Sequence, residues 1–75
     1  MNRKIYHVTP SGDVWRVKRA GATRAASVHE NKSMAVARAK ALAKSASLGQ
    51  VKVHRRNGEI QTEYTYGDDP SRTRG

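Results

Sequence analysis

The chain has 75 residues, which is enough for one domain with one small hydrophobic core. It contains no cysteine, which excludes disulfides and thiolate metal sites, and no apolar run approaches the roughly 20 residues of a membrane-spanning helix. Its 15 Lys and Arg residues against six Asp and Glu residues give a formal net charge of +9. A field of this sign attracts polyanions such as nucleic acid.

The basic charge is concentrated in the first three quarters of the chain. All but two of the Lys and Arg residues precede residue 57, and Asp13 and Glu30 are the only acids among them. The N-terminus also lacks the apolar region of a signal peptide, so we expect a cytoplasmic protein without membrane contact.

Two short strands open the chain. Residues 4–8 and 14–19 are rich in β-branched and aromatic residues, and the turn formers between them predict an antiparallel hairpin. Residues 23–29 form a weaker third segment, which we interpret as an edge strand because Thr and Val favour strands while its alanines dilute the pattern.

Residues 31–47 carry the only convincing helix pattern. Turning 100° per residue places Ala35, Ala39, Leu42, Ala43 and Ala46 on one side, and it places Ser33, Lys40 and Lys44 on the other. Asn31 is predicted as the N-cap, and Gly49 is predicted as the stop that follows the helix.

The last two strands are predicted over residues 50–56 and 59–66. Asn57-Gly58 between them favours a tight type I′ hairpin turn. Strict alternation directs Val51 and Val53 inward, and Ile60 is expected on the inward face of the final strand. Residues 68–75 are polar and are predicted to form a disordered tail.

The predicted fold is α+β: an antiparallel sheet of four or five strands in the order strand–strand–(strand)–helix–strand–strand, with one amphipathic helix packed on one face. Residues 1–67 would form a single domain.

Short motifs support this interpretation. The residues that carry them are Tyr6-His7-Val8-x-Pro10, Gly12-x-x-Trp15-x-Val17-Lys18, Val53-His54, Gly58-x-Ile60-Gln61 and Tyr66-Gly67-x-Asp69-Pro70. In order and spacing they resemble a family of short bacterial proteins of unknown function, domain of unknown function two-one-eight-eight. The resemblance covers about residues 5–70 and implies a common fold, but it implies no catalytic residue, ligand or cofactor.

The candidate site is a basic surface on the side of the sheet away from the helix. Alternation directs His7, Arg16, Lys18, Lys52 and His54 outward. The residues predicted to contact nucleic acid are Arg16, Lys18, Arg19, Arg24, Lys52, Arg55 and Arg56. Contact through phosphates, without sequence readout, is the expected mode.

Other chemistry has less support in the residues. Trp15 and Tyr6 are expected in the core, together with Tyr64, which argues against base stacking on exposed rings. His7, His29 and His54 lie on separate elements. His7 and His54 could approach each other across the sheet, but no metal-ligand spacing or cofactor motif is present. A ribonuclease-like site with His54 as acid or base beside Arg55 or Lys52 is chemically possible, although no spacing indicates it.

The function predicted from the sequence is a small basic module that binds DNA or RNA non-specifically. The first alternative is a protein-interaction module, either a homodimer or a partner of another protein, whose charge is incidental. The second alternative is a small ribonuclease or toxin; otherwise no enzyme activity is expected.

Overall fold

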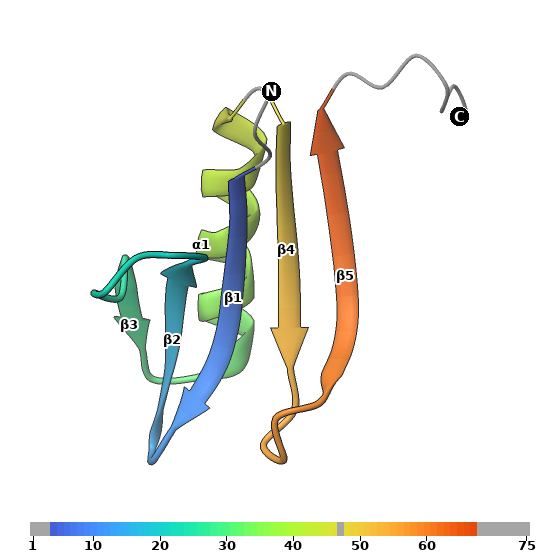
Figure 1. Cartoon of the computed structure of the whole chain (residues 1–75). Coiled ribbons are helices and arrows are strands. Elements are labelled where there is room, and N and C mark those ends of the chain that lie inside the picture. Colours follow the sequence, from blue (N-terminus) through green and yellow to red (C-terminus); the bar gives the residue numbers. More distant parts are fainter. Residues whose placement is uncertain (1–3, 47, 68–75) are drawn as a thin grey trace.

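Five strands and one helix make up residues 4–46 and 48–67, the parts of the chain described by a computed structural model (Figure 1). The elements are β1 (Lys4–Ser11), β2 (Val14–Arg19), β3 (Ser27–His29), α1 (Lys32–Ser45), β4 (Leu48–His54) and β5 (Ile60–Gly67). The predicted polar tail, residues 68–75, lies outside the described residues.

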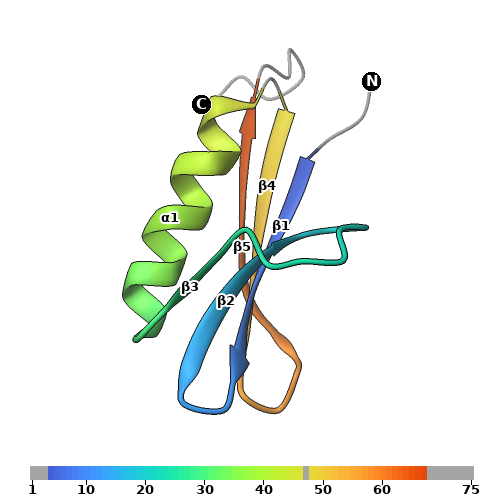
Figure 2. The same cartoon turned by 90° about the vertical axis from the view of Figure 1, so that its left-hand side faces the viewer.

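The strands form one sheet in the order β3-β2-β1-β4-β5, and α1 lies across one face of it (Figures 1 and 2). The predicted α+β class, with one helix on one face, is therefore confirmed. Of the edge strand predicted over residues 23–29, only residues 27–29 form a strand. One pairing differs from the prediction: β1 and β4 run parallel, so the sheet is mixed and not antiparallel throughout. A parallel pair needs a crossover, which β2, β3 and α1 together provide.

The helix begins as its sequence predicts. Asn31 adopts an extended backbone conformation, and its side-chain oxygen accepts a hydrogen bond from the Met34 amide at 2.9 Å. Such a cap satisfies a backbone donor that has no partner within the helix, and it stabilises the helix by about 1 kcal/mol. The helix ends at Ser45, and Ala46 is its C-cap.

Gly49 has a role that its position after the helix did not indicate. It is no helix stop: it lies inside β4, is buried, and is not among the glycines with a positive φ. A Cβ built at this position would lie 2.2 Å from the Ala43 carbonyl oxygen. Gly49 therefore allows a close approach between β4 and the backbone of α1 at Ala43.

The core lies between α1 and the sheet. Val8, Val17 and Val51 are fully buried there. From the helix side, Ala35, Ala39 and Ala43 meet them, also fully buried. Because these helix residues end at Cβ, the helix can approach the strands closely, and the small chain buries its apolar surface in one thin layer.

The β4–β5 hairpin differs from the predicted type I′ turn. Gly58 alone has a positive φ, 95°, and its amide bonds the Arg55 carbonyl at 2.8 Å. A β-bulge then shifts the register between Val53 and His54. Val53 pairs with Thr62, whereas His54 pairs with Ile60. Ile60 is 45% exposed as a result, and its predicted inward position is wrong because the bulge shifts the alternation.

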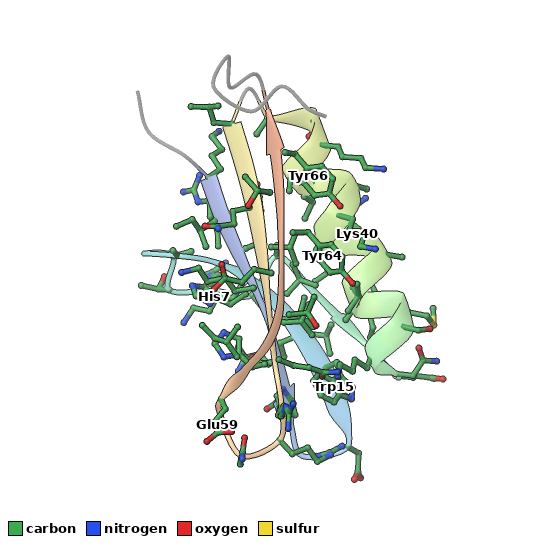
Figure 3. All side chains as sticks on the ribbon, turned by 90° about the vertical axis from the view of Figure 1, so that its right-hand side faces the viewer. His7, Trp15, Lys40, Glu59, Tyr64 and Tyr66 are labelled. Carbon is green, nitrogen blue, oxygen red and sulfur yellow. The ribbon has the colours of Figure 1, made fainter. Side chains whose placement is uncertain are left out.

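The aromatic residues lie on the helix side, as predicted (Figure 3). Trp15 is buried, and Tyr64 and Tyr66 are partly buried against the core. The Nζ atoms of Lys40 and Lys44 lie over the rings of Tyr64 and Tyr66, at 4.0 and 5.6 Å from their centroids. These two lysines therefore flank the helix–sheet interface and do not occupy the far side of the helix, where the helical wheel had placed them.

Candidate nucleic-acid interface

The face of the sheet opposite α1, here called the open face, carries the predicted basic residues. The pairing register places Lys18 on β2 and Lys52 on β4 on either side of His7 on β1. Arg16 pairs with Thr9, one step further along the same face of β1. Figure 3 shows His7 on the side of the sheet away from the helix. Cations of two strands therefore surround the central strand.

The connection between β2 and β3 makes one wall of this face. It extends away from the sheet on the side opposite the helix (Figure 2). Its first turn closes with a bond from the Ala22 amide to the Arg19 carbonyl at 3.0 Å, and Gly21 supplies the positive φ of 86°. Such a φ at the third position is typical of a type II turn and favours glycine.

A cavity of about 470 Å³ lies between this wall and the strands. It is lined by His7, Thr9, Arg16, Lys18, Arg19, Ala20, Gly21, Ala22 and His54. Its charged side chains are all cationic, and its two imidazoles come from β1 and β4. A hollow with these donors can hold an anion such as a phosphate group, which cationic side chains bind through charge-assisted hydrogen bonds.

The two imidazoles in the cavity are in direct contact. The distance between His7 Nδ1 and His54 Nε2 is 2.9 Å, and the ring centroids are 5.1 Å apart. The other ring nitrogen of His54, Nδ1, lies 3.2 Å from the Gly58 carbonyl oxygen. The parallel pairing of β1 and β4 produces this contact, because Val8 pairs with Val53 and places His7 and His54 on neighbouring positions of the same face.

The electrostatics of the open face oppose further positive charge. Partial burial lowers the pKa of His7 below its ordinary value of 6.5, and the charges of His54 and Lys52 lower it further. Glu63 of β5 pairs with Lys52 in the register, and its carboxylate accepts a hydrogen bond from Gln50 at 3.4 Å. The open face therefore carries an acidic side chain, Glu63, at its β5 edge.

The structure brings together four of the seven predicted contact residues. Arg16, Lys18 and Arg19 line the cavity, and Lys52 lies beside His7. Arg24 belongs to the exposed β2–β3 connection and does not line the cavity.

The other two predicted residues lie on the β4–β5 turn, where Arg55 is exposed. Arg56 has structural contacts: it donates a hydrogen bond to the Gly12 carbonyl at 3.1 Å, and its guanidinium lies 5.5 Å from the Trp15 ring centroid. Arg56 therefore ties the two hairpin turns together and is a poor candidate for ligand contact.

The wall of the cavity was not predicted from the sequence. Residues 20–22, which form it, lie between two predicted strands, and no binding role was expected for them. The third histidine is separate from the pair: His29 pairs with Trp15 in the register, on the helix side, and its ring lies 2.8 Å from Ser27 Oγ.

Within residues 4–46 and 48–67, no three His, Asp or Glu side chains are placed to hold a metal ion together. In the same part of the chain, no helix has the length and apolarity required to cross a bilayer.

Comparison with known families gives one match. A family model described as "Uncharacterized protein conserved in bacteria (DUF2188)" matches residues 6–66. No match was found among curated proteins or solved structures. The match spans all five strands and the helix except for the first and last residues of the sheet.

Proposed function

The chain belongs to this uncharacterised bacterial family, whose description names no activity, and we propose from its surface that it binds nucleic acid through backbone phosphates on the open face. The observation that supports the proposal most is the cluster of Arg16 and Lys18 at the cavity, with Lys52 beside His7; none of the described residues that line the cavity is acidic. Phosphate contacts of Lys and Arg supply most of the non-specific affinity for nucleic acid.

The shape of the open face fits an extended polyanion better than a flat charged surface would. Arg16 and Lys18 on β2 and Lys52 on β4 lie on either side of β1, and the β2–β3 connection rises beside these strands (Figure 2). The aromatic rings pack on the opposite side, where they cannot stack on bases. The expected binding therefore depends on phosphates and tolerates many sequences.

The test is a fluorescence-anisotropy titration with labelled duplex DNA, single-stranded DNA and an RNA hairpin at several salt concentrations. The logarithm of the affinity should fall with the logarithm of the salt concentration, with a slope of about −0.9 per phosphate for duplex DNA. Replacing Arg16, Lys18 and Lys52 together by Gln should reduce the size of the slope by about one for each phosphate that the variant no longer binds.

A matched control is available on the helix. Replacing Arg38, Lys40 and Lys44 together by Gln removes the same net charge from the other side of the molecule. The proposal predicts a much smaller loss of affinity for this variant. Equal losses of affinity in the two variants would contradict binding at the open face. Binding that occurs only at low salt, and equally to heparin and to all three nucleic acids, would show that it depends on net charge alone.

A protein-interaction module is the second candidate, and one observation favours it. The eight-residue strand β5 lies at the edge of the sheet and pairs only with β4 among the described residues. Unpaired strand edges are a recognised surface for adding a further strand. Sedimentation at increasing protein concentration tests self-association through this edge; a constant monomeric mass would contradict a homodimer.

A further inference from the structure

The hydrogen bonds of the histidine pair determine where its protons lie. The Gly58 carbonyl oxygen can only accept, so His54 Nδ1 carries a hydrogen and donates it. In neutral His54 the Nε2 atom is then unprotonated, and it accepts the hydrogen of His7 Nδ1 at 2.9 Å. Neutral His7 is therefore left with an unprotonated Nε2.

The same geometry determines where an additional proton must go. If His7 is protonated, the new hydrogen is on Nε2. If the charge instead moves to His54, the shared hydrogen shifts to His54 Nε2, and His7 still carries its hydrogen on Nε2. In both cases the pair gains one donor, at the atom of His7 that faces away from His54. A second added proton would place two hydrogens between the rings and break their bond, so the pair takes up one proton as a unit.

Without an anion, this uptake is opposed. The charged and titratable groups around His7 are Arg16, Lys18 and Arg19 from β2, with Lys52 and the imidazole of His54 from β4. Glu63 of β5 lies one strand further away, opposite Lys52. The helix packs on the other face of the sheet. Burial and positive neighbours lower the pKa of His7, so the free protein favours the neutral form of His7.

We propose that the His7–His54 pair and the cations Arg16 and Lys18 form a phosphodiester-binding site that takes up one proton together with its anion. The proposal rests on the function proposed above and identifies the pair as the part of the open face that responds to pH. A phosphodiester oxygen accepts the hydrogen of His7 Nε2, and its negative charge offsets the repulsion that opposes protonation of His7 in the free protein.

Direct contact between the rings favours binding over acid–base cleavage at this site. In a ribonuclease-like pair, one imidazole must accept a proton while the other donates one, each at its own position on the substrate. Here each ring uses one nitrogen for the other, and the second nitrogen of His54 is bonded to a carbonyl. His7 Nε2 alone is left to reach a ligand.

The experiment measures the affinity for rhodamine-labelled duplex DNA at constant ionic strength, from about pH 8.5 to about pH 5.5. For one linked proton, each unit by which the bound anion raises the pKa of the pair corresponds to a tenfold gain in affinity. We expect the dissociation constant of the unmodified protein to fall about tenfold over this range. His7→Gln should reduce the change to less than about twofold, and His29→Gln should leave it intact.

A second measurement uses the unmodified protein and does not depend on how a variant folds. Nitrogen-15 spectra of the imidazole rings distinguish protonated from unprotonated nitrogens. At about pH 6.5 the free protein should show His7 mainly with hydrogen on Nδ1, and added duplex DNA should increase the signal of a protonated Nε2. An unchanged His7 spectrum in saturated complex would overturn the proposal.

The two proposals fail in different ways. Proton uptake contributes least at pH 8.5, so salt-dependent binding there that is weakened by replacing Arg16, Lys18 and Lys52 with Gln supports the proposed function alone. If binding is equal at all pH values, or if His29→Gln removes the pH dependence, the proton-linked site is wrong and the proposed function stands. If no binding occurs at pH 8.5 in low salt, the proposed function is wrong.

Discussion

Both faces of the sheet carry lysine side chains, but the lysines of the two faces have different neighbours. On the helix side, Lys40 and Lys44 lie over Tyr64 and Tyr66, so their charges are directed at aromatic rings of the same chain. On the open face, Lys18 and Lys52 lie on either side of His7, which offers no negative charge, and Glu63 lies opposite Lys52 alone. The helix-side cations thus contribute to the fold, whereas Lys18 and its neighbour Arg16 are available to an external anion.

The largest effect on the helix side is expected at Gly49. Gly49→Ala would place a methyl group 2.2 Å from the Ala43 carbonyl oxygen, and the backbone of α1 would have to move away from β4. We expect a loss of about 3 kcal/mol in the free energy of unfolding, the upper end of what overpacking costs. Urea unfolding measures it. Gln50→Ala, one residue along on the open face, is the control, and an equal loss there would contradict the close approach.

A second comparison uses one residue type on both faces. Val17 is fully buried under the helix, whereas Val28 is 55% exposed and pairs with Arg16 on the open face. Val17→Ala should cost about 2 kcal/mol, because it removes buried apolar surface and leaves a cavity. Val28→Ala should change the stability by less than about 0.5 kcal/mol. Similar values for the two variants would contradict the exposed position of Val28 on β3.

The third prediction concerns the cation over Tyr64. Lys40→Gln should lower the free energy of unfolding by about 0.5–1 kcal/mol, because a cation close to an exposed ring contributes about that amount. Arg38→Gln removes an equal charge from an exposed helix position and should have a smaller effect. If Arg38→Gln destabilises the protein as much as Lys40→Gln, the lysine–tyrosine contact makes no specific contribution.

The smallest effect is expected from pH. Because the pKa of His7 is lower in the folded chain than in the unfolded chain, the unfolded state binds more protons as the pH falls below 6.5. Stability contributed by neutral His7 is therefore present above pH 6.5 and is lost as the pH falls through the folded-state pKa. Chemical unfolding at about pH 7.5 and 5.5 should show this loss, and His7→Gln should reduce it. If the His7→Gln variant loses as much stability at low pH as the unmodified protein, the pH dependence does not come from His7.

The stability of the free protein and its affinity for DNA are expected to depend on pH in opposite directions. Acid destabilises the free protein through His7, whereas the proton-linked site predicts that acid strengthens binding to DNA. A general effect of net charge would not require His7 for both.

Alternation was enough to predict the two faces. It directs Val51 and Val53 toward the helix and Lys52 and His54 away from it, because successive side chains of a strand point to opposite sides. The N-cap at Asn31 follows from a local hydrogen bond and was equally accessible. Local patterns of this kind need no knowledge of which strands are neighbours.

The remaining features depend on contacts between distant segments. The His7–His54 bond requires β1 and β4 to be adjacent and parallel, and strand order is decided by packing and not by local pattern. The bulge that exposes Ile60 arises from the pairing of β5 with β4. Long lysine side chains reach rings that a helical wheel assigns to another side, because the wheel places Cβ atoms and not charged ends.

The most direct test of the open face as the binding face is an NMR titration of the nitrogen-15-labelled protein with duplex DNA at moderate salt. If DNA binds there, the largest amide shifts should occur at Arg16, Lys18, Gly21 and Lys52, and the amides of Ala35 and Ala39 on the helix should change little. Shifts concentrated along α1, with the open face unchanged, would contradict binding at the open face.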